Sequence, residues 1–198
     1  MQGTSPALLG ALRRATRASH DRLEARLPLG RDGQTLSSYR SILKALHGFY
    51  VPLESMIDGV AAQLAPLQWE PRRKAQLLRT DLLALGATDE GIDALPHCQA
   101  LPTLRGAPEA LGCLYVVEGA TLGGRVISRG LRRLGISAGS GGRFFDGYGE
   151  RTGNMWKELM ERLRMGEGDP RDEERTVATA VALFESMEHW LQDRGVLE

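Results

Sequence analysis

The chain has 198 residues, enough for one domain with its own hydrophobic core. Its 25 basic and 25 acidic residues cancel, which argues against a general nucleic-acid binder with a strong basic excess. Two cysteines without a CxxC spacing offer neither a disulfide framework nor a zinc site, and no window approaches 18 uninterrupted apolar residues. We therefore expect a cytoplasmic protein that does not span a membrane.

The first predicted helix covers residues 6–27. Ser5-Pro6 places a capping residue before a proline, an arrangement favoured at helix starts. One face then repeats every three or four residues: Leu12, Thr16, His20, Leu23 and Leu27. Proline and glycine end the pattern after residue 27.

The rest of the chain also shows helical spacing. A second helix is expected from a cap at Ser37 or Ser38 to roughly Leu64, with a kink at Pro52. A third is expected at 71–85, and residues 88–106 allow at most a short helix. Further helices are expected at 107–135, 151–165 and 170–194, with a loop at 136–150. No stretch alternates as a strand does, so we predict an all-α fold with a single domain at 1–198.

His20 is the first candidate for chemistry. It lies on the apolar stripe of the first predicted helix, and a neutral imidazole is a good iron ligand. Glu24 follows one turn later, where a carboxylate can orient the ring through its second nitrogen. A helical pair that only aids stability remains the alternative.

The predicted helix at 107–135 is unusually rich in glycine. Gly112, Gly119, Gly123 and Gly130 are spaced seven, four and seven residues apart, which gives one nearly bare face. Each interior glycine costs roughly 1 kcal/mol relative to alanine, so something must offset that cost. Either a flat ligand lies against the backbone, or two soluble helices pack closely. Charged residues in the same span disfavour a membrane GxxxG motif.

Several basic side chains are candidates for binding anionic groups. They are Arg13, Lys157, and four arginines late in the glycine-rich segment, Arg125, Arg129, Arg132 and Arg133. For any one of them, a solvated helix face is the better explanation. The remaining histidines have no spacing typical of a zinc site.

Five segments, in order along the chain, together resemble the haem oxygenase family. They are residues 15–24 with Thr16, His20 and Glu24, residues 39–54, residues 70–75 with Asp81-Leu82, Gly119-x-x-x-Gly123-Gly124, and Trp156-Lys157-Glu158-Leu159. The form VxEGxTLGG most resembles bacterial members, including those paired with bacteriophytochromes. Ala120 departs from the aspartate that many members place there to organise water.

The resemblance implies haem held between the first helix and the glycine-rich helix. It implies the following roles: His20 as the iron ligand with Glu24 on its far nitrogen, Gly119, Gly123 and Gly124 on the distal face, Tyr50 in a distal hydrogen-bond network, and Arg13 and Lys157 near the haem propionates. A distal face without a central histidine or arginine suits self-oxidation of the porphyrin, in which haem is both cofactor and substrate.

The function implied is cleavage of haem to biliverdin, CO and ferrous iron with O2. Electrons would come from a separate reductase or ferredoxin, since no flavin or nicotinamide fingerprint is present. A bacteriophytochrome is a possible acceptor of biliverdin. One rival is a haem carrier or sensor on the same fold without turnover. Another is a thiaminase-like TENA scaffold, although neither cysteine, Cys98 or Cys113, has a convincing catalytic setting.

Overall fold

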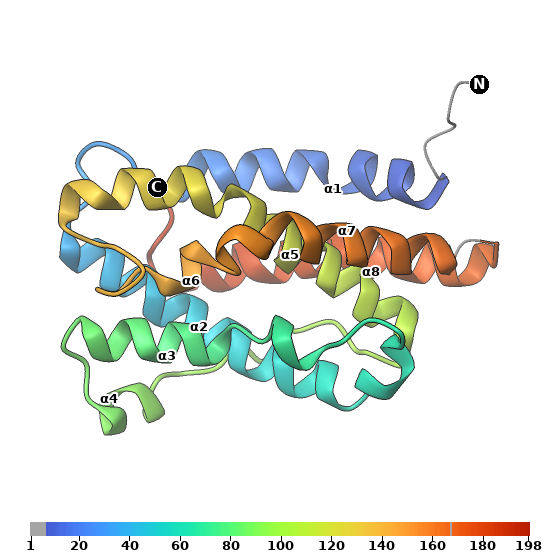
Figure 1. The fold of residues 1–198 in the computed structure, drawn as a ribbon, viewed down its shortest axis with the longest axis horizontal. Helices are drawn as coiled ribbons and strands as arrows, with labels where there is room; N and C mark the ends of the chain where they lie inside the picture. Colours follow the sequence, from blue (N-terminus) through green and yellow to red (C-terminus); the bar gives the residue numbers. More distant parts are fainter. Residues whose placement is uncertain (1–6, 167) are drawn as a thin grey trace.

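The computed structural model describes residues 7–166 and 168–198, and these residues form helices and turns without a strand (Figure 1). The predicted all-α class is confirmed. The helices are α1 (Ala7–Arg26), α2 (Leu36–Asp58), α3 (Ala75–Ala84), α4 (Asp89–Asp93), α5 (Ala107–Leu131), α6 (Arg143–Asp146), α7 (Thr152–Met165) and α8 (Pro170–Asp193). Short 3-10 turns lie at Ala61–Leu64, Glu70–Arg72, Arg132–Leu134 and Gly149–Arg151.

Helix α8 is the element around which the others gather. Both α5 and α1 pack along it, and α2 contacts it while also packing on α3. In Figure 1, α1 runs along one edge, α7 and α8 occupy the middle, and α2 and α3 form the opposite edge. The core consists mainly of leucines and aromatic residues, as expected when amphipathic helices bury their apolar faces.

Charged contacts fix how α1 sits on α8. The Glu188 carboxylate accepts hydrogen bonds from Arg22 Nε at 2.8 Å and from Arg26 Nη1 at 2.9 Å. Glu188 is only 14% exposed, so solvent screens these pairs less than it screens pairs on the open surface. The face of α1 that carries His20 is thereby held in a defined orientation.

The start and end of α2 differ from the prediction. Thr35 is the N-cap, not Ser37 or Ser38, and Ser38 instead completes a capping box with it. The helix ends at Asp58, short of Leu64, and a separate 3-10 turn follows. The 3-10 turn buries Leu64 in the same core as α2. The apolar pattern of the sequence therefore extends to Leu64 although the helix does not.

The start of α3 also differs from the prediction, because a distant carboxylate caps it. The helix begins at Ala75, and Pro71 belongs to a preceding 3-10 turn. Glu54 of α2 accepts hydrogen bonds from the backbone N–H groups of Lys74 and Ala75, at 2.5 and 2.9 Å. A cap supplied from another helix leaves no local signal in the sequence.

The predicted loop at 136–150 contains the short helix α6. Asp81 of α3 accepts hydrogen bonds from the backbone N–H groups of Arg143 and Phe144, both at 2.8 Å. The expectation of an entirely irregular segment was therefore wrong, again because the capping group is far away in the chain.

Three glycines of α5 are explained by close packing. A Cβ at Gly112 would collide with the Thr176 carbonyl of α8, and one at Gly124 with the Phe145 carbonyl. At Gly130 it would collide with the backbone of Gly30. The bare face expected at Gly112, Gly119, Gly123 and Gly130 is thus covered at its two ends.

No single helix among the described residues is long and apolar enough to cross a membrane. A bent pair over 107–124 and 126–134 meets that test only when its two halves are taken together.

Candidate functional site

His20 lies at the solvent-exposed edge of α1, beside the buried face of that helix. Its side chain is 57% exposed, whereas Thr16 and Leu23 are buried. The imidazole meets Phe184 of α8 edge-on, with ring centroids 6.3 Å apart. The ring is therefore supported by α8 and still reachable from outside.

Two carboxylates lie near one nitrogen of the His20 ring. Nδ1 is 3.7 Å from Glu24 Oε2 and 3.4 Å from Asp21 Oδ1. A carboxylate at Nδ1 favours the tautomer with its proton there, which leaves the Nε2 lone pair for a metal. The arrangement is chemically suited to ligation, and the iron-ligand role stays a prediction.

An exposed apolar face lies in the middle of α5. Leu122 is 42% exposed and Val126 is 65% exposed. With Gly119 and Gly123 they follow helical spacing, so the four positions share one face. A Cβ at Gly123 would meet no atom within 4 Å, and one at Gly119 would make only ordinary contact with Trp156 at 3.9 Å. Packing inside the described chain therefore does not explain these two glycines.

Helix α1 and the loop that follows it contact α5 on either side of this exposed face. At one end, Thr16 and Arg13 interact with Tyr115 and partly offset the burial that raises the pKa of its hydroxyl. At the other end, Gly30 lies against Gly130, and Arg133 donates to the Gly30 carbonyl at 2.9 Å.

The two contacts indicate how the segment of α1 and its following loop runs along α5. Thr16 pairs with Tyr115 and Gly30 with Gly130, so the two segments run in the same direction, as Figure 1 also shows. His20 lies one turn beyond Thr16, and Gly119 lies one turn beyond Tyr115. The exposed imidazole and the exposed apolar face consequently lie at the same level of the molecule.

The two basic candidates lie near Tyr115 and Trp156. The rings of these aromatic residues are 5.8 Å apart, and the charge of Arg13 acts on Tyr115. Lys157 directly follows Trp156; it is 76% exposed and 3.8 Å from Glu161. Both cations are exposed.

Two other candidates have different surroundings. Tyr50 is buried on α2 and packs edge-on against Phe144, with centroids 5.2 Å apart. Burial is the main cause that raises the pKa of its hydroxyl, followed by the nearby charges of Glu118 and Glu54. Gly124 faces α6. The site roles expected for Tyr50 and Gly124 stay predictions.

A buried charge network directly before Gly119 had no signature in the sequence. The Glu118 carboxylate accepts hydrogen bonds from Arg72 at 3.1 Å, Lys74 at 2.7 Å and the Tyr148 hydroxyl at 2.5 Å. Burial is the main cause that lowers the pKa of Lys74. Arg72 also donates to the Met155 carbonyl at 3.1 Å. The network ties α5 to the 70–74 segment and to α7.

Known proteins resemble this chain along most of its length. A family model described as heme oxygenase matches residues 6–193. A heme oxygenase from Xanthomonas campestris pv. campestris (strain 8004) is 34% identical over 106 residues. That alignment covers 53% of this chain and 59% of the relative, so it spans somewhat more than half of each protein.

Solved structures share the fold. The heme oxygenase of Neisseria meningitidis, solved with NO and CO bound, has a TM-score of 0.76 at 19% identity and covers 94% of this chain and 91% of its own. The Leptospira interrogans enzyme has a TM-score of 0.76 at 15% identity, over 94% and 99% of the two chains. Heme oxygenase-1 of Synechocystis sp. PCC6803, in complex with heme, has a TM-score of 0.67 at 16% identity, over 94% and 91%.

Proposed function

The chain belongs to the haem oxygenase family, and from that premise we propose that it binds haem between α1 and α5 and opens the porphyrin ring to biliverdin. The observation that carries the proposal is the pairing of an exposed histidine with an exposed apolar glycine face. His20 and the Gly119 to Val126 face lie at the same level, between the Thr16 contact with Tyr115 and the Gly30 contact with Gly130.

The residues present fit a haem group. An imidazole whose Nδ1 faces a carboxylate is a suitable axial ligand for iron. Gly119 and Gly123 leave the backbone of α5 bare, and Leu122 and Val126 add apolar surface for the porphyrin. Burial of that surface under a ligand would also remove an exposed apolar patch from water.

Each side chain then has a defined task. Glu24 orients the imidazole of His20, and Gly119 and Gly123 keep side chains away from the reacting edge. Arg13 and Lys157 bind the propionates by charge-assisted hydrogen bonds. When bound, haem supplies the iron that activates O2 and is at the same time the substrate. A separate reductase or ferredoxin supplies electrons, and a bacteriophytochrome accepts the biliverdin.

A cysteine-based reaction on the same scaffold has less support. Cys98 and Cys113 are both buried, and burial raises the pKa of the Cys113 thiol to about 12. A thiol in such surroundings stays protonated and is a poor nucleophile.

The proposal is tested by adding haem and a reductant to the protein in air while the visible spectrum is recorded. We expect a histidine-ligated haem spectrum that decays as biliverdin absorption grows. His20→Ala is expected to lose both signals. A stable haem complex without biliverdin would instead identify a carrier or sensor, and an unchanged His20→Ala spectrum would place the ligand elsewhere.

A further inference from the structure

One turn of α1 brings three possible metal ligands together. His20 Nδ1 lies 3.4 Å from Asp21 Oδ1 and 3.7 Å from Glu24 Oε2, and the three ligand atoms all lie within 4.8 Å of one another. In a tetrahedral site with metal–ligand bonds of about 2.0–2.1 Å, neighbouring ligand atoms are about 3.4 Å apart. Two of the three separations on α1 are therefore already close to those of a metal site.

The third separation is able to close because all three side chains are exposed and can rotate. Their exposed fractions are 57% for His20, 63% for Asp21 and 75% for Glu24. The two carboxylates bring a charge of minus two, which Arg17 partly offsets from 3.7 Å away. That ion pair is exposed and screened by salt, so it holds Asp21 only weakly. The turn keeps a net negative charge and attracts a cation.

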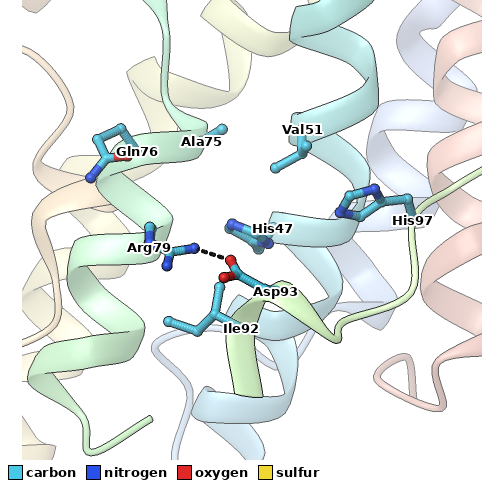
Figure 2. A pocket seen from close by; sticks show the side chains of 8 residues that line it. All are labelled: His47, Val51, Ala75, Gln76, Arg79, Ile92, Asp93 and His97. Carbon is cyan, nitrogen blue, oxygen red and sulfur yellow. Dashed lines mark hydrogen bonds and ion pairs between the residues drawn. The ribbon is translucent and has the colours of Figure 1, made fainter. Parts of the chain in front are cut away.

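Histidines and a carboxylate also surround a hollow between α2, α3 and α4, but the hollow lacks this geometry. There Arg79 donates to Asp93 at 2.6 Å, so that carboxylate is already occupied and the two charges cancel (Figure 2). His47 and His97 lie on the other sides of the hollow. Among the described residues, the group whose ligand atoms lie within 4.8 Å of one another is the one on α1.

We propose that His20, Asp21 and Glu24 bind a divalent transition-metal ion, and that this ion and haem exclude each other. One imidazole and two carboxylates suit ions such as Zn²⁺ and Co²⁺, with water in the remaining positions. The ion binds Nδ1, on the side of the ring that faces the two carboxylates. The exclusion of haem rests on the proposed function, in which haem iron binds the other nitrogen of His20.

The exclusion follows from the two nitrogens of one imidazole ring. A neutral imidazole has one N–H group and one lone pair. A metal ion on Nδ1 uses the lone pair there and leaves the proton on Nε2, where haem iron needs a lone pair. When haem is bound, the proton is on Nδ1 beside Glu24, and the metal ion loses its nitrogen ligand. Binding both at once requires a ring stripped of both protons, which neutral solution strongly disfavours.

The haem-free, full-length chain tests the metal site independently of the proposed function. Zn²⁺ is titrated by calorimetry and Co²⁺ by its visible absorption, and we expect one saturable equivalent of each ion. Asp21→Asn is the deciding variant, because Asp21 is exposed and has no task in the proposed haem site. Loss of this charged ligand is expected to weaken Zn²⁺ binding at least about tenfold.

A matched control lies on α8. His189 and Asp193 are exposed and one helical turn apart, as His20 and Glu24 are, but they do not belong to the group of close ligand atoms. His189→Ala is therefore expected to leave the Zn²⁺ affinity unchanged. Absence of saturable Zn²⁺ binding, or an affinity in Asp21→Asn equal to that of the parent protein, would overturn the metal site.

Competition is measured by titrating haem into the protein with and without Zn²⁺. Zn²⁺ at ten times its Kd is expected to raise the apparent Kd of haem about tenfold in the parent protein, and about twofold in Asp21→Asn. Without Zn²⁺ the two proteins are expected to bind haem equally. Equal haem affinity with and without Zn²⁺ in the parent protein would overturn the exclusion. If the metal-free protein binds no haem, the proposed function and the exclusion both fail, whereas the Zn²⁺ titrations still decide the metal site.

Discussion

Lys74 Nζ lies 2.7 Å from the Glu118 carboxylate, and both side chains are at most 2% exposed. Arg72 and Tyr148 bind the same carboxylate. Charges removed from water are tolerated only when their partners are present. The turn of α5 immediately before Gly119 is therefore held by a buried ion pair, and water cannot reach either partner to replace the other.

Replacement of Glu118 by glutamine is expected to destabilise the fold severely. The change leaves the buried Lys74 without its bonded carboxylate, while Arg72 keeps Glu158 at 2.9 Å, and the free energy of unfolding should fall by about 3–5 kcal/mol. Urea unfolding measures the loss. Glu70→Gln is the control, since Glu70 pairs with Arg73 at 2.8 Å but is 80% exposed, and little change is expected there. Equal losses in both variants would contradict the structural role of the network.

Neighbouring glycines of α5 should respond differently to valine. Gly123→Val enters open space, so the haem-free protein should keep its melting temperature, while haem binding and biliverdin formation fall. Gly124→Val collides with the Phe145 carbonyl and should lower the melting temperature by several degrees, in line with overpacking of about 1–3 kcal/mol. Full activity per folded molecule in Gly123→Val would show that this face of α5 does not contact haem.

Arg13 and Lys157 are expected to orient haem through its propionates. Replacing either with alanine should weaken haem binding or change the ratio of biliverdin isomers, because the porphyrin is then free to rotate in its plane. Haem titration and chromatography of the products measure the two effects. Arg171, an exposed cation near the start of α8, provides the control. If both variants match the parent protein in haem affinity and isomer ratio, Arg13 and Lys157 do not bind the propionates and are only solvated surface residues.

Glu188 should make the α1 and α8 contact sensitive to acid. Hydrogen bonding from Arg22 is the main cause that lowers the pKa of Glu188 below its ordinary value of 4.5. The stabilisation is thus present above that ordinary pKa and is lost as the pH falls through the lower, folded-state value. Unfolding followed as a function of pH should show this loss in the parent protein and in the exposed Glu174→Gln control. A Glu188→Gln variant with the same acid dependence would contradict the assignment.

Local sequence patterns predicted most of the helices but few of their interactions. Spacing along the chain located α1, α5, α7 and α8 closely, because each has a long amphipathic or glycine-marked pattern. The starts of α3 and α6 were not predictable, since Glu54 and Asp81 cap them from other helices. Sequence spacing reports only on residues that are a few positions apart, so it does not predict a cap supplied by a distant helix.

The same limit applies to the candidate site. His20 and Glu24 were recognisable because one helical turn separates them, and Gly119 and Gly123 because interior glycines are costly. Tyr115 was not singled out, although its contact with Thr16 sets the level at which α1 and α5 face each other. Glu118 and Lys74 are 44 residues apart, so no local sequence pattern predicts their pairing.

The carboxylate of Glu118 also constrains how this sequence can change over evolutionary time. Three donors share one acceptor, so replacements at Arg72, Lys74 and Tyr148 are not independent of one another or of position 118. Once Glu118 is lost, the buried Lys74 has no bonded carboxylate and lowers the stability of the fold. Its replacement by an uncharged residue then becomes stabilising. Substitution at these four positions is therefore expected to proceed jointly, and a lineage that loses Glu118 is expected to lose the buried Lys74 with it.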